Sequence, residues 1–332
     1  MLLWFVVVIV ILAASGSIYQ AVATVRDKRN YPPPGQMVSV GDRRLHLQVT
    51  GEAGDKPTVI LAAGMGSFST NWYWVQEELS TATRVVSFDR AGLGWSDPAP
   101  EVHDAYDSAA DLYQALQNAG IPGPYIVAGH SYGGLVVRAF TDLYRDEVVG
   151  MVLVDGSHPE QWARIPTSRN GKVNAISTKI TGWLAWVGVV RLFDLSASLG
   201  QGLPERPAGE MRAIMNRPQS WATAGAALSI WPERTTPRIN QAEKLGDLPL
   251  IVLGVTEQPF YGDILTSLQA ELPALSTNSR LYIVEGATHE GLVAEREHAL
   301  VVVATIRQVL AAAQTGQPLA DSSLSILGEV NQ

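Results

Sequence analysis

The chain has 332 residues, with 24 basic and 32 acidic side chains, a formal net charge of −8 and no cysteine. That length allows one large domain or two small ones with a full core. The acidic balance, without any Lys/Arg-rich block, argues against a nucleic-acid partner. The absence of cysteine excludes disulfides, a thiolate nucleophile and thiolate–metal sites. The six histidines lack the i, i+4 spacing of a zinc-binding helix, and we expect no metal or cofactor.

The amino-terminal segment is apolar, and residues 1–25 are expected to form a single-pass membrane anchor or a signal segment. Leu2–Ala14 is continuously apolar, and the next basic residue is Arg26. About 20 such residues cross a bilayer. The basic flank Arg26–Arg29 follows the run and nothing basic precedes it, which favours an anchor with the folded domain in the cytoplasm. The alternative is secretion after cleavage near Ala21–Ala23. The basic n-region that usually begins a signal peptide is missing before the apolar run.

Residues 26–35 are expected to be a linker, since Tyr31-Pro32-Pro33-Pro34-Gly35 is a stiff extended spacer. A hairpin is predicted around Gly41-Asp42, between the alternating runs Met37–Val40 and Arg44–Val49. A core is expected over residues 36–157 and 246–313.

Six further apolar runs have the length of buried strands. They are Thr58–Ala63, Arg84–Phe88, Tyr125–Ala128, Val148–Val154, Leu248–Leu253 and Arg280–Val284. Their near-continuous hydrophobicity is typical of parallel strands covered on both faces. Helical patterns over Tyr106–Leu116 and Leu135–Leu143 alternate with them. The pattern predicts an α/β fold with a doubly wound, mostly parallel, eight-stranded sheet.

Residues 158–245 interrupt this alternation, because they contain helical patterns and no strand-like run. Two helices are predicted there, over Ile180–Phe193 and Ser220–Trp231. We expect a helical cap, inserted after the sixth strand, over the carboxyl ends of the strands. Residues 314–332 are polar and aperiodic, and are expected to be a mobile tail.

The cap is rich in apolar side chains, which either line a hydrophobic substrate pocket, pack the cap on the core or contact a bilayer. They are Trp183, Leu184, Trp186, Val187, Val189, Val190, Leu192, Phe193, Trp221 and Trp231.

The nucleophile candidate is Ser131, in Gly129-His130-Ser131-Tyr132-Gly133-Gly134 between a predicted strand and a predicted helix. G-x-S-x-G alone is a weak pattern, and the strand–turn–helix context is what supports it. The small residues let strand and helix approach around a strained serine. The helix amino terminus then favours a developing negative charge beside the hydroxyl.

Two further elements complete the chemistry. The loop Ala63-Gly64-Met65-Gly66 can aim the Met65 N–H, together with that of Tyr132, at a substrate oxyanion. In serine enzymes of this context the acid and the histidine follow the serine in the chain. His289, after the strand Arg280–Val284, is therefore the candidate base.

The other histidines are given no catalytic role. His130 is expected to pack beside the turn that carries Ser131. His46, His103 and His298 are expected to lie on exposed faces. The acid stays open between Asp155, at the end of Val148–Val154, and Glu257, in the loop expected after Leu248–Leu253. Either carboxylate could orient the imidazole.

Phe88-Asp89-Arg90-Ala91-Gly92-Leu93-Gly94-Trp95-Ser96-Asp97-Pro98 resembles the D-R-x-G-x-G-x-S element of the α/β-hydrolase superfamily. With Gly129–Gly134, Leu153–Asp155 and Gly286–His289 in order, the resemblance extends over about Gly35–Ala312. The chain is similar to the branch of small esterases, proline iminopeptidases, cofactor-free haloperoxidases, epoxide hydrolases and haloalkane dehalogenases. A serine nucleophile argues against the last two, which use aspartate.

The chain departs from the family at Ala63, where a histidine usually precedes the glycine of the oxyanion loop. Most members place the acid after the seventh strand, which matches Glu257, and a minority place it after the sixth, which matches Asp155. Relatives with the L-V-D-x-x-H-P form favour Asp155.

The resemblance implies a serine hydrolase that cleaves a carboxylic ester with a hydrophobic acyl or alkyl group through an acyl-enzyme. The enzymatic alternative is an aminopeptidase like proline iminopeptidase, which needs a cap carboxylate such as Glu205 or Glu210 for the substrate amine. The non-enzymatic alternative is an inactive ligand-binding homologue, which the presence of Ser131 and His289 disfavours.

Overall fold

The computed structural model describes residues 1–166, 171–257 and 262–320, and contains one eight-stranded sheet in the order β1-β2-β4-β3-β5-β6-β7-β8. The β1–β2 and β2–β4 pairs are antiparallel and all other pairs are parallel, as predicted. The strands are β1 (Gln36–Val40), β2 (Arg43–Thr50), β3 (Thr58–Ala62), β4 (Val85–Phe88), β5 (Tyr125–His130), β6 (Val148–Val154), β7 (Leu250–Glu257) and β8 (Ser279–Thr288).

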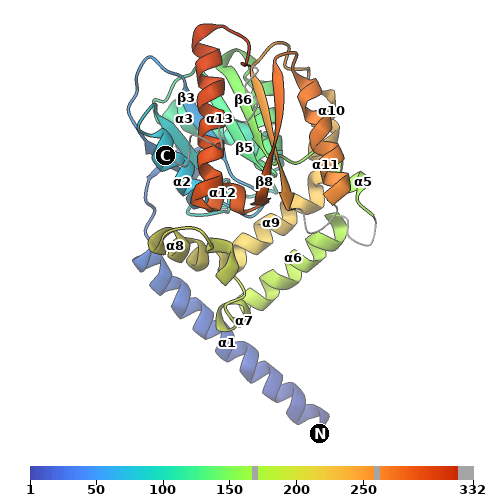
Figure 1. Cartoon of the computed structure of the whole chain (residues 1–332). Coiled ribbons are helices and arrows are strands. Elements are labelled where there is room, and N and C mark those ends of the chain that lie inside the picture. The colour runs from blue at the N-terminus through green and yellow to red at the C-terminus, as the bar shows by residue number, and fades with distance from the viewer. Residues whose placement is uncertain (167–170, 258–261, 321–332) are drawn as a thin grey trace.

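Helices cover both faces of the sheet, so its central strands β3 and β5 are buried throughout. One face packs against α3 (Ala105–Asn118) and α4 (Gly133–Leu143). The other packs against α2 (Tyr73–Leu79), α12 (Gly291–Ala294) and α13 (Arg296–Thr315), with α13 lying across the strands in Figure 1. The remaining core helix, α11 (Gly262–Glu271), contacts β7.

The start of α3 follows directly from its sequence. The Asp104 carboxylate accepts hydrogen bonds from the Tyr106 and Asp107 N–H groups, and the Asp107 carboxylate accepts one from the Asp104 N–H. This reciprocal cap satisfies donors that a helix amino terminus otherwise leaves unpaired. Gly120, in the left-handed region at φ +67°, follows the end of the helix.

A cap of helices connects β6 to β7, and its helices α6 to α9 lie below the carboxyl ends of the strands in Figure 1. Its helices are α5 (Gln161–Arg164), α6 (Gly171–Trp186), α7 (Val189–Leu192), α8 (Glu205–Met215), α9 (Pro218–Ile230) and α10 (Thr236–Gln241). The single helix predicted over Ile180–Phe193 is wrong. Gly188 adopts φ +77°, which few residues other than glycine reach, and this breaks the segment into α6 and α7.

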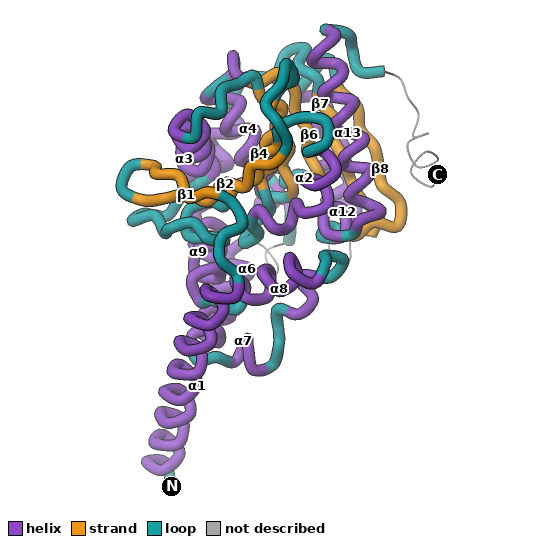
Figure 2. Tube along the Cα trace, turned by 90° about the vertical axis from the view of Figure 1, so that its left-hand side faces the viewer, coloured by secondary structure: helices purple, strands orange, loops and turns teal. Residues whose placement is uncertain are grey.

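The amino-terminal helix α1 (Leu2–Asn30) projects from the cap in Figures 1 and 2. It includes residues 26–30, which were expected in the linker, because arginine and lysine are good helix formers. Among the described residues, two helices are long and apolar enough to cross a membrane, α1 and α13. Half of the apolar window of α13 is buried against the sheet, whereas that of α1 is not buried at all.

Three further expectations differ from the structure. β7 extends to Glu257, opposite Thr288 of β8, so Glu257 ends a strand and does not lie in a loop. His46 is fully buried, and its imidazole is paired there, since Nδ1 lies 3.0 Å from the Asp89 carboxylate. Helix α13 includes Gln314 and Thr315 of the expected tail, and residues 321–332 lie outside the described residues.

Candidate active site

Ser131 occupies a sharp turn between β5 and α4. Its φ is +53°, a left-handed conformation that costs a non-glycine residue free energy. The flanking glycines make the turn possible. A Cβ on Gly129 would lie 2.4 Å from the Gly133 carbonyl oxygen, and a Cβ on Gly133 would lie 2.0 Å from that of Ala62. The steric condition inferred from the G-x-S-x-G pattern is therefore met at both glycines.

The turn is tied to the end of β6, where Asp155 lies. The Ser131 N–H donates to the Val154 carbonyl at 3.2 Å, and the Ser157 N–H donates to the Ser131 carbonyl at 2.9 Å. Asp155 is buried, with φ +42°, and its N–H donates to the Leu253 carbonyl at 2.7 Å. Two strained residues on adjacent strands thus face the same edge of the sheet.

His289 follows β8, and its imidazole Nδ1 is hydrogen-bonded to Oδ2 of Asp155. Burial alone lowers the pKa of His289. The hydrogen bond and the charge of the Asp155 carboxylate outweigh burial and hold this pKa above its ordinary value. The residues that the structure describes include no hydrogen bond between the Ser131 hydroxyl and the imidazole. Backbone hydrogen bonds join the Ser131 turn to the segment of Asp155, and a side-chain hydrogen bond joins Asp155 to His289.

His130 supplies one of those contacts. Its Nε2 donates to the His289 carbonyl oxygen at 2.9 Å, and the two rings lie 4.5 Å apart between centroids. Burial lowers the pKa of His130 to about 3, so the ring stays neutral at physiological pH. His130 thus packs beside the turn, as expected, and holds the loop that carries His289.

The second acid candidate, Glu257, has its backbone beside Thr288, the residue before His289. Its side chain lies outside the described part of the chain. The carboxylate that the structure does describe at the imidazole is that of Asp155.

The loop after β3 lies against the serine. A Cβ on Gly64 would lie 3.1 Å from the Ser131 Cβ and 3.3 Å from Nδ1 of His130, so only glycine fits without displacement. Among the described residues, the N–H groups of Met65 and Tyr132 donate to no protein acceptor. Both are therefore free to bind an anionic oxygen.

Arg90 fixes the orientation of this loop, a role that the sequence did not reveal. Its buried guanidinium donates to the Ala63 carbonyl and, at 2.6 Å, to the Gly64 carbonyl. The C=O and N–H of a trans peptide point in opposite directions, so the Gly64–Met65 peptide turns the Met65 N–H away from Arg90. Burial lowers the pKa of Arg90 to about 10, and the side chain stays charged. The available signal was the pair of charged residues, Asp89 and Arg90, that follows the buried strand β4.

We expect Arg90→Lys to lower kcat by about 10- to 100-fold with little change in KM, because lysine cannot hold both carbonyls in the fixed fork of arginine. Arg138→Lys is the matched control. Arg138 is a half-buried arginine on α4, and desolvation likewise lowers its pKa to about 10. Steady-state kinetics on a soluble ester measures both variants. Equal losses in the two would reduce Arg90 to a general stabilising role.

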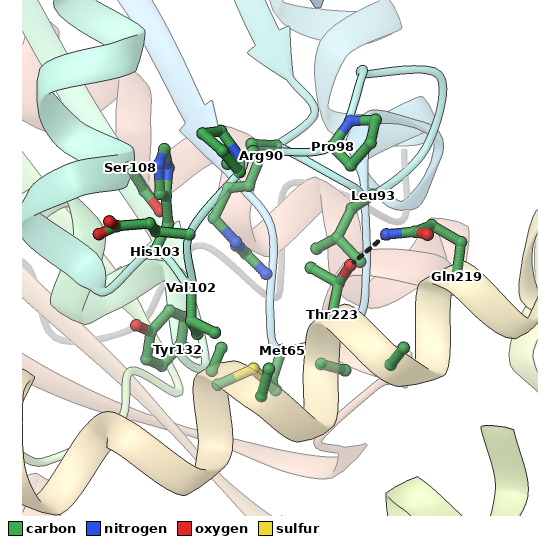
Figure 3. A pocket seen from close by; sticks show the side chains of 18 residues that line it. Met65, Arg90, Leu93, Pro98, Val102, His103, Ser108, Tyr132, Gln219 and Thr223 are labelled. Carbon is green, nitrogen blue, oxygen red and sulfur yellow. Dashed lines mark hydrogen bonds between the residues drawn. The ribbon is translucent and has the colours of Figure 1, made fainter.

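A pocket of about 220 Å³ lies between the loop after β4 and helix α9 of the cap, as Figure 3 shows. Met65 and Tyr132 line it, whereas Ser131, Asp155 and His289 are not among its lining residues. Gln219 and Thr223 of α9 close the opposite side, joined by a hydrogen bond of 3.1 Å. The pocket is smaller than most ligand sites, which have about 300–1,000 Å³.

None of the ten apolar cap residues, for which pocket lining was one of three alternatives, lines this pocket. Trp183, Trp186, Leu192 and Phe193 are each more than half exposed. The periodicity of the cap sequence identified apolar helix faces, but not whether they point toward the pocket or toward the outside of the molecule. Trp231 does face inward, with its ring 5.3 Å from that of Tyr132.

These features define a hydrolase fold, and comparison with known proteins gives the family. A profile of the "Alpha/beta hydrolase family" matches residues 59–305. The chain belongs to this family.

An uncharacterized protein of Schizosaccharomyces pombe is 25% identical over 289 residues, which are 77% of this chain and 52% of that protein. The chain spans 20% to 52% of the length of the first curated relatives that it matches.

Two solved structures share the fold. A thermophilic esterase from Thermogutta terrifontis superposes with a TM-score of 0.62 at 22% identity, covering 83% of this chain and 100% of that one. An epoxide hydrolase of Bacillus megaterium superposes with a TM-score of 0.62 at 16% identity, covering 82% and 100%.

Proposed function

We propose that the protein is a serine hydrolase that cleaves carboxylic esters with an apolar acyl or alkyl group. The observation that carries this proposal is the hydrogen bond between Asp155 and His289 beside a serine in a strained turn. A buried carboxylate on one imidazole nitrogen fixes the tautomer and leaves the other nitrogen able to take a proton.

In the proposed mechanism, the Ser131 hydroxyl attacks the ester carbonyl carbon while His289 takes the hydroxyl proton. Asp155 stabilises the imidazolium that forms. The carbonyl oxygen, now an anion, accepts hydrogen bonds from the Met65 and Tyr132 N–H groups. His289 then gives its proton to the leaving alcohol, and an acyl-enzyme remains. Water, activated by His289, attacks the acyl-enzyme and frees Ser131 and the acid.

The aminopeptidase alternative has less support. Glu210 is buried and engaged, since it accepts a hydrogen bond from the Thr70 hydroxyl at 3.3 Å and pairs with Arg206 at 3.2 Å. Burial raises the pKa of Glu210. Neither Glu205 nor Glu210 lines the pocket beside Met65 and Tyr132.

If the pocket lined by Met65 and Tyr132 receives the acyl chain, p-nitrophenyl esters with short acyl chains should be hydrolysed fastest, because its volume is only about 220 Å³. Rates for a graded series from acetate to laurate measure this preference, and proline p-nitroanilide serves as the comparison substrate. Turnover of the anilide without ester hydrolysis would favour the aminopeptidase. Absence of turnover with every substrate would contradict the ester proposal.

We also propose that α1 anchors the protein in a membrane and is not cleaved. The helix carries no charged side chain from Leu2 to Val25, and its last turn contains the basic residues Lys28 and Arg29. Basic residues directly after an apolar span favour a cytoplasmic position for the hydrolase that follows them.

A further inference from the structure

The cap carries exposed apolar side chains on the side that faces away from the sheet. They belong to α6, to α7 and to the turn after α7, and each is more than half exposed. We call them the outer cap face: Ile180, Trp183, Trp186, Leu192, Phe193 and Leu195. The first three recur every third residue along α6 and so share one side of it. Because α6 and α7 contact each other, these exposed apolar side chains lie on adjoining elements, as is typical of an interaction site.

Helix α1 joins the cap through a polar and small-residue face. A Cβ on Gly16 would lie 2.1 Å from the Val187 carbonyl oxygen, so the backbones of α1 and the α6–α7 turn are in close contact. The buried Gln20 amide donates to the Asn216 carbonyl at 2.7 Å and accepts from Arg191 at 3.1 Å. Asp27 pairs with Arg191 at 2.7 Å. Gly16, Gln20 and Asp27 recur at helical spacing, so one face of α1 is matched to the cap.

The opposite face of α1 is apolar and uncovered along the same stretch. Ile18 and Val22 are each 66% exposed, and Val25 is 52% exposed. These side chains need an apolar environment. That environment must therefore include the part of α1 that is packed on the cap, and not only the part before it. Figures 1 and 2 show the free amino-terminal part of α1 continuing beyond α7.

The length of the helix gives the same result. Leu2–Ser15, the part before the cap contact, has about 14 residues and a length of about 21 Å, which is shorter than the bilayer core of about 30 Å. Leu2–Val25 has about 24 residues and a length of about 36 Å, enough to cross it with some tilt. A crossing of the bilayer therefore needs the segment that is packed on the cap.

We propose that the outer cap face is seated in the interfacial layer of the phospholipid bilayer that α1 crosses. This inference rests on the proposed anchor. Trp183 and Trp186 are of the residue type that concentrates at the level of the lipid headgroups. An apolar face enters the headgroup and acyl boundary by about 5–10 Å. The bilayer thereby covers both Val22 on α1 and Phe193 on the cap.

Single-cysteine labelling tests the seating, and the absence of native cysteine makes each introduced thiol unique. The full chain is reconstituted in vesicles of phosphatidylcholine and phosphatidylglycerol, with a nitrobenzoxadiazole label at one position. Trp183→Cys and Phe193→Cys report the outer cap face, and Ile9→Cys reports the anchor. Leu143→Cys, at the exposed end of α4 on the core, is the matched control.

We expect labels at 183 and 193 to emit at shorter wavelength and to be quenched most by lipids spin-labelled near the headgroup. The label at 9 should be quenched most by lipids labelled deep in the acyl chain, and the label at 143 only by aqueous iodide. Iodide quenching at 183 and 193 equal to that at 143, with 9 still deep, would overturn the seating alone. Iodide quenching at all four positions would overturn the anchor and the seating together.

Discussion

Ser131→Ala is expected to abolish labelling by a fluorophosphonate probe and to lower kcat for ester hydrolysis by about 10⁶-fold. The physical reason is that the proposed acyl-enzyme can form only on the Ser131 hydroxyl. Alanine keeps the Cβ that the strained turn already accommodates at φ +53°, so the fold should be retained. Circular dichroism and thermal unfolding check the fold, and gel fluorescence checks the labelling.

Ser157→Ala is the matched control for this experiment. Ser157 is a buried serine next to the same turn, and its contact with Ser131 is made by its backbone N–H, which alanine retains. Its labelling and kcat should stay near those of the wild type. Undiminished labelling of Ser131→Ala would place the nucleophile elsewhere and remove the basis of the proposed mechanism.

Asp155→Asn is expected to lower kcat by about 10⁴-fold, with KM changed little. A neutral amide in place of the carboxylate does not stabilise the positive charge of the imidazolium. It also favours the wrong tautomer of His289. Asparagine tolerates the left-handed φ of +42° at this position, so the backbone should stay in place. Steady-state kinetics over a series of pH values gives both kcat and the ionisation of His289.

The pH profile has a definite direction. His289 must be neutral to take a proton, and Asp155 holds its pKa above the ordinary value. The acid limb of kcat/KM should therefore lie above pH 6.5, the ordinary pKa of histidine, and should move to lower pH in Asp155→Asn. The same pairing stabilises the fold below the unfolded pKa of the imidazole, and this stabilisation is lost as the pH rises through the raised folded pKa.

Glu257→Gln is the comparison that assigns the acid. Its residual rate should stay within a few fold of the wild type, because Asp155 already binds the imidazole. A loss in Glu257→Gln as large as that in Asp155→Asn would refute the choice of Asp155.

The sheet could be predicted because its strands are short, nearly continuous apolar runs. Runs of this kind are typical of parallel strands that are buried on both faces. Val148–Val154 is strand β6 in the structure, with the predicted ends. The last two strands of the chain were harder to delimit. β7 and β8 continue through Thr256 and Glu285, exposed polar residues that read as a loop in the sequence.

The nucleophile candidate could be predicted because its glycines meet a steric condition. A strand and a helix can approach around a sharp turn of this kind only where the flanking residues are small. The partners of Ser131 depend instead on contacts between distant segments. Asp155 and Glu257 both follow apolar runs, and spacing alone does not distinguish them. Arg90 was missed because its role is to bind the carbonyls of Ala63 and Gly64, two groups that every sequence contains.

The close contact between Gly16 and the α6–α7 turn has a consequence for motion. A helix held by a bilayer and joined to the cap at Gln20 and Asp27 makes the cap the stationary part of the molecule. Any opening between cap and sheet would then swing the sheet domain, which would pivot on the chain segments that enter and leave the cap. The usual picture of a lid moving over a fixed enzyme would be reversed, with the catalytic domain rising from a platform at the membrane.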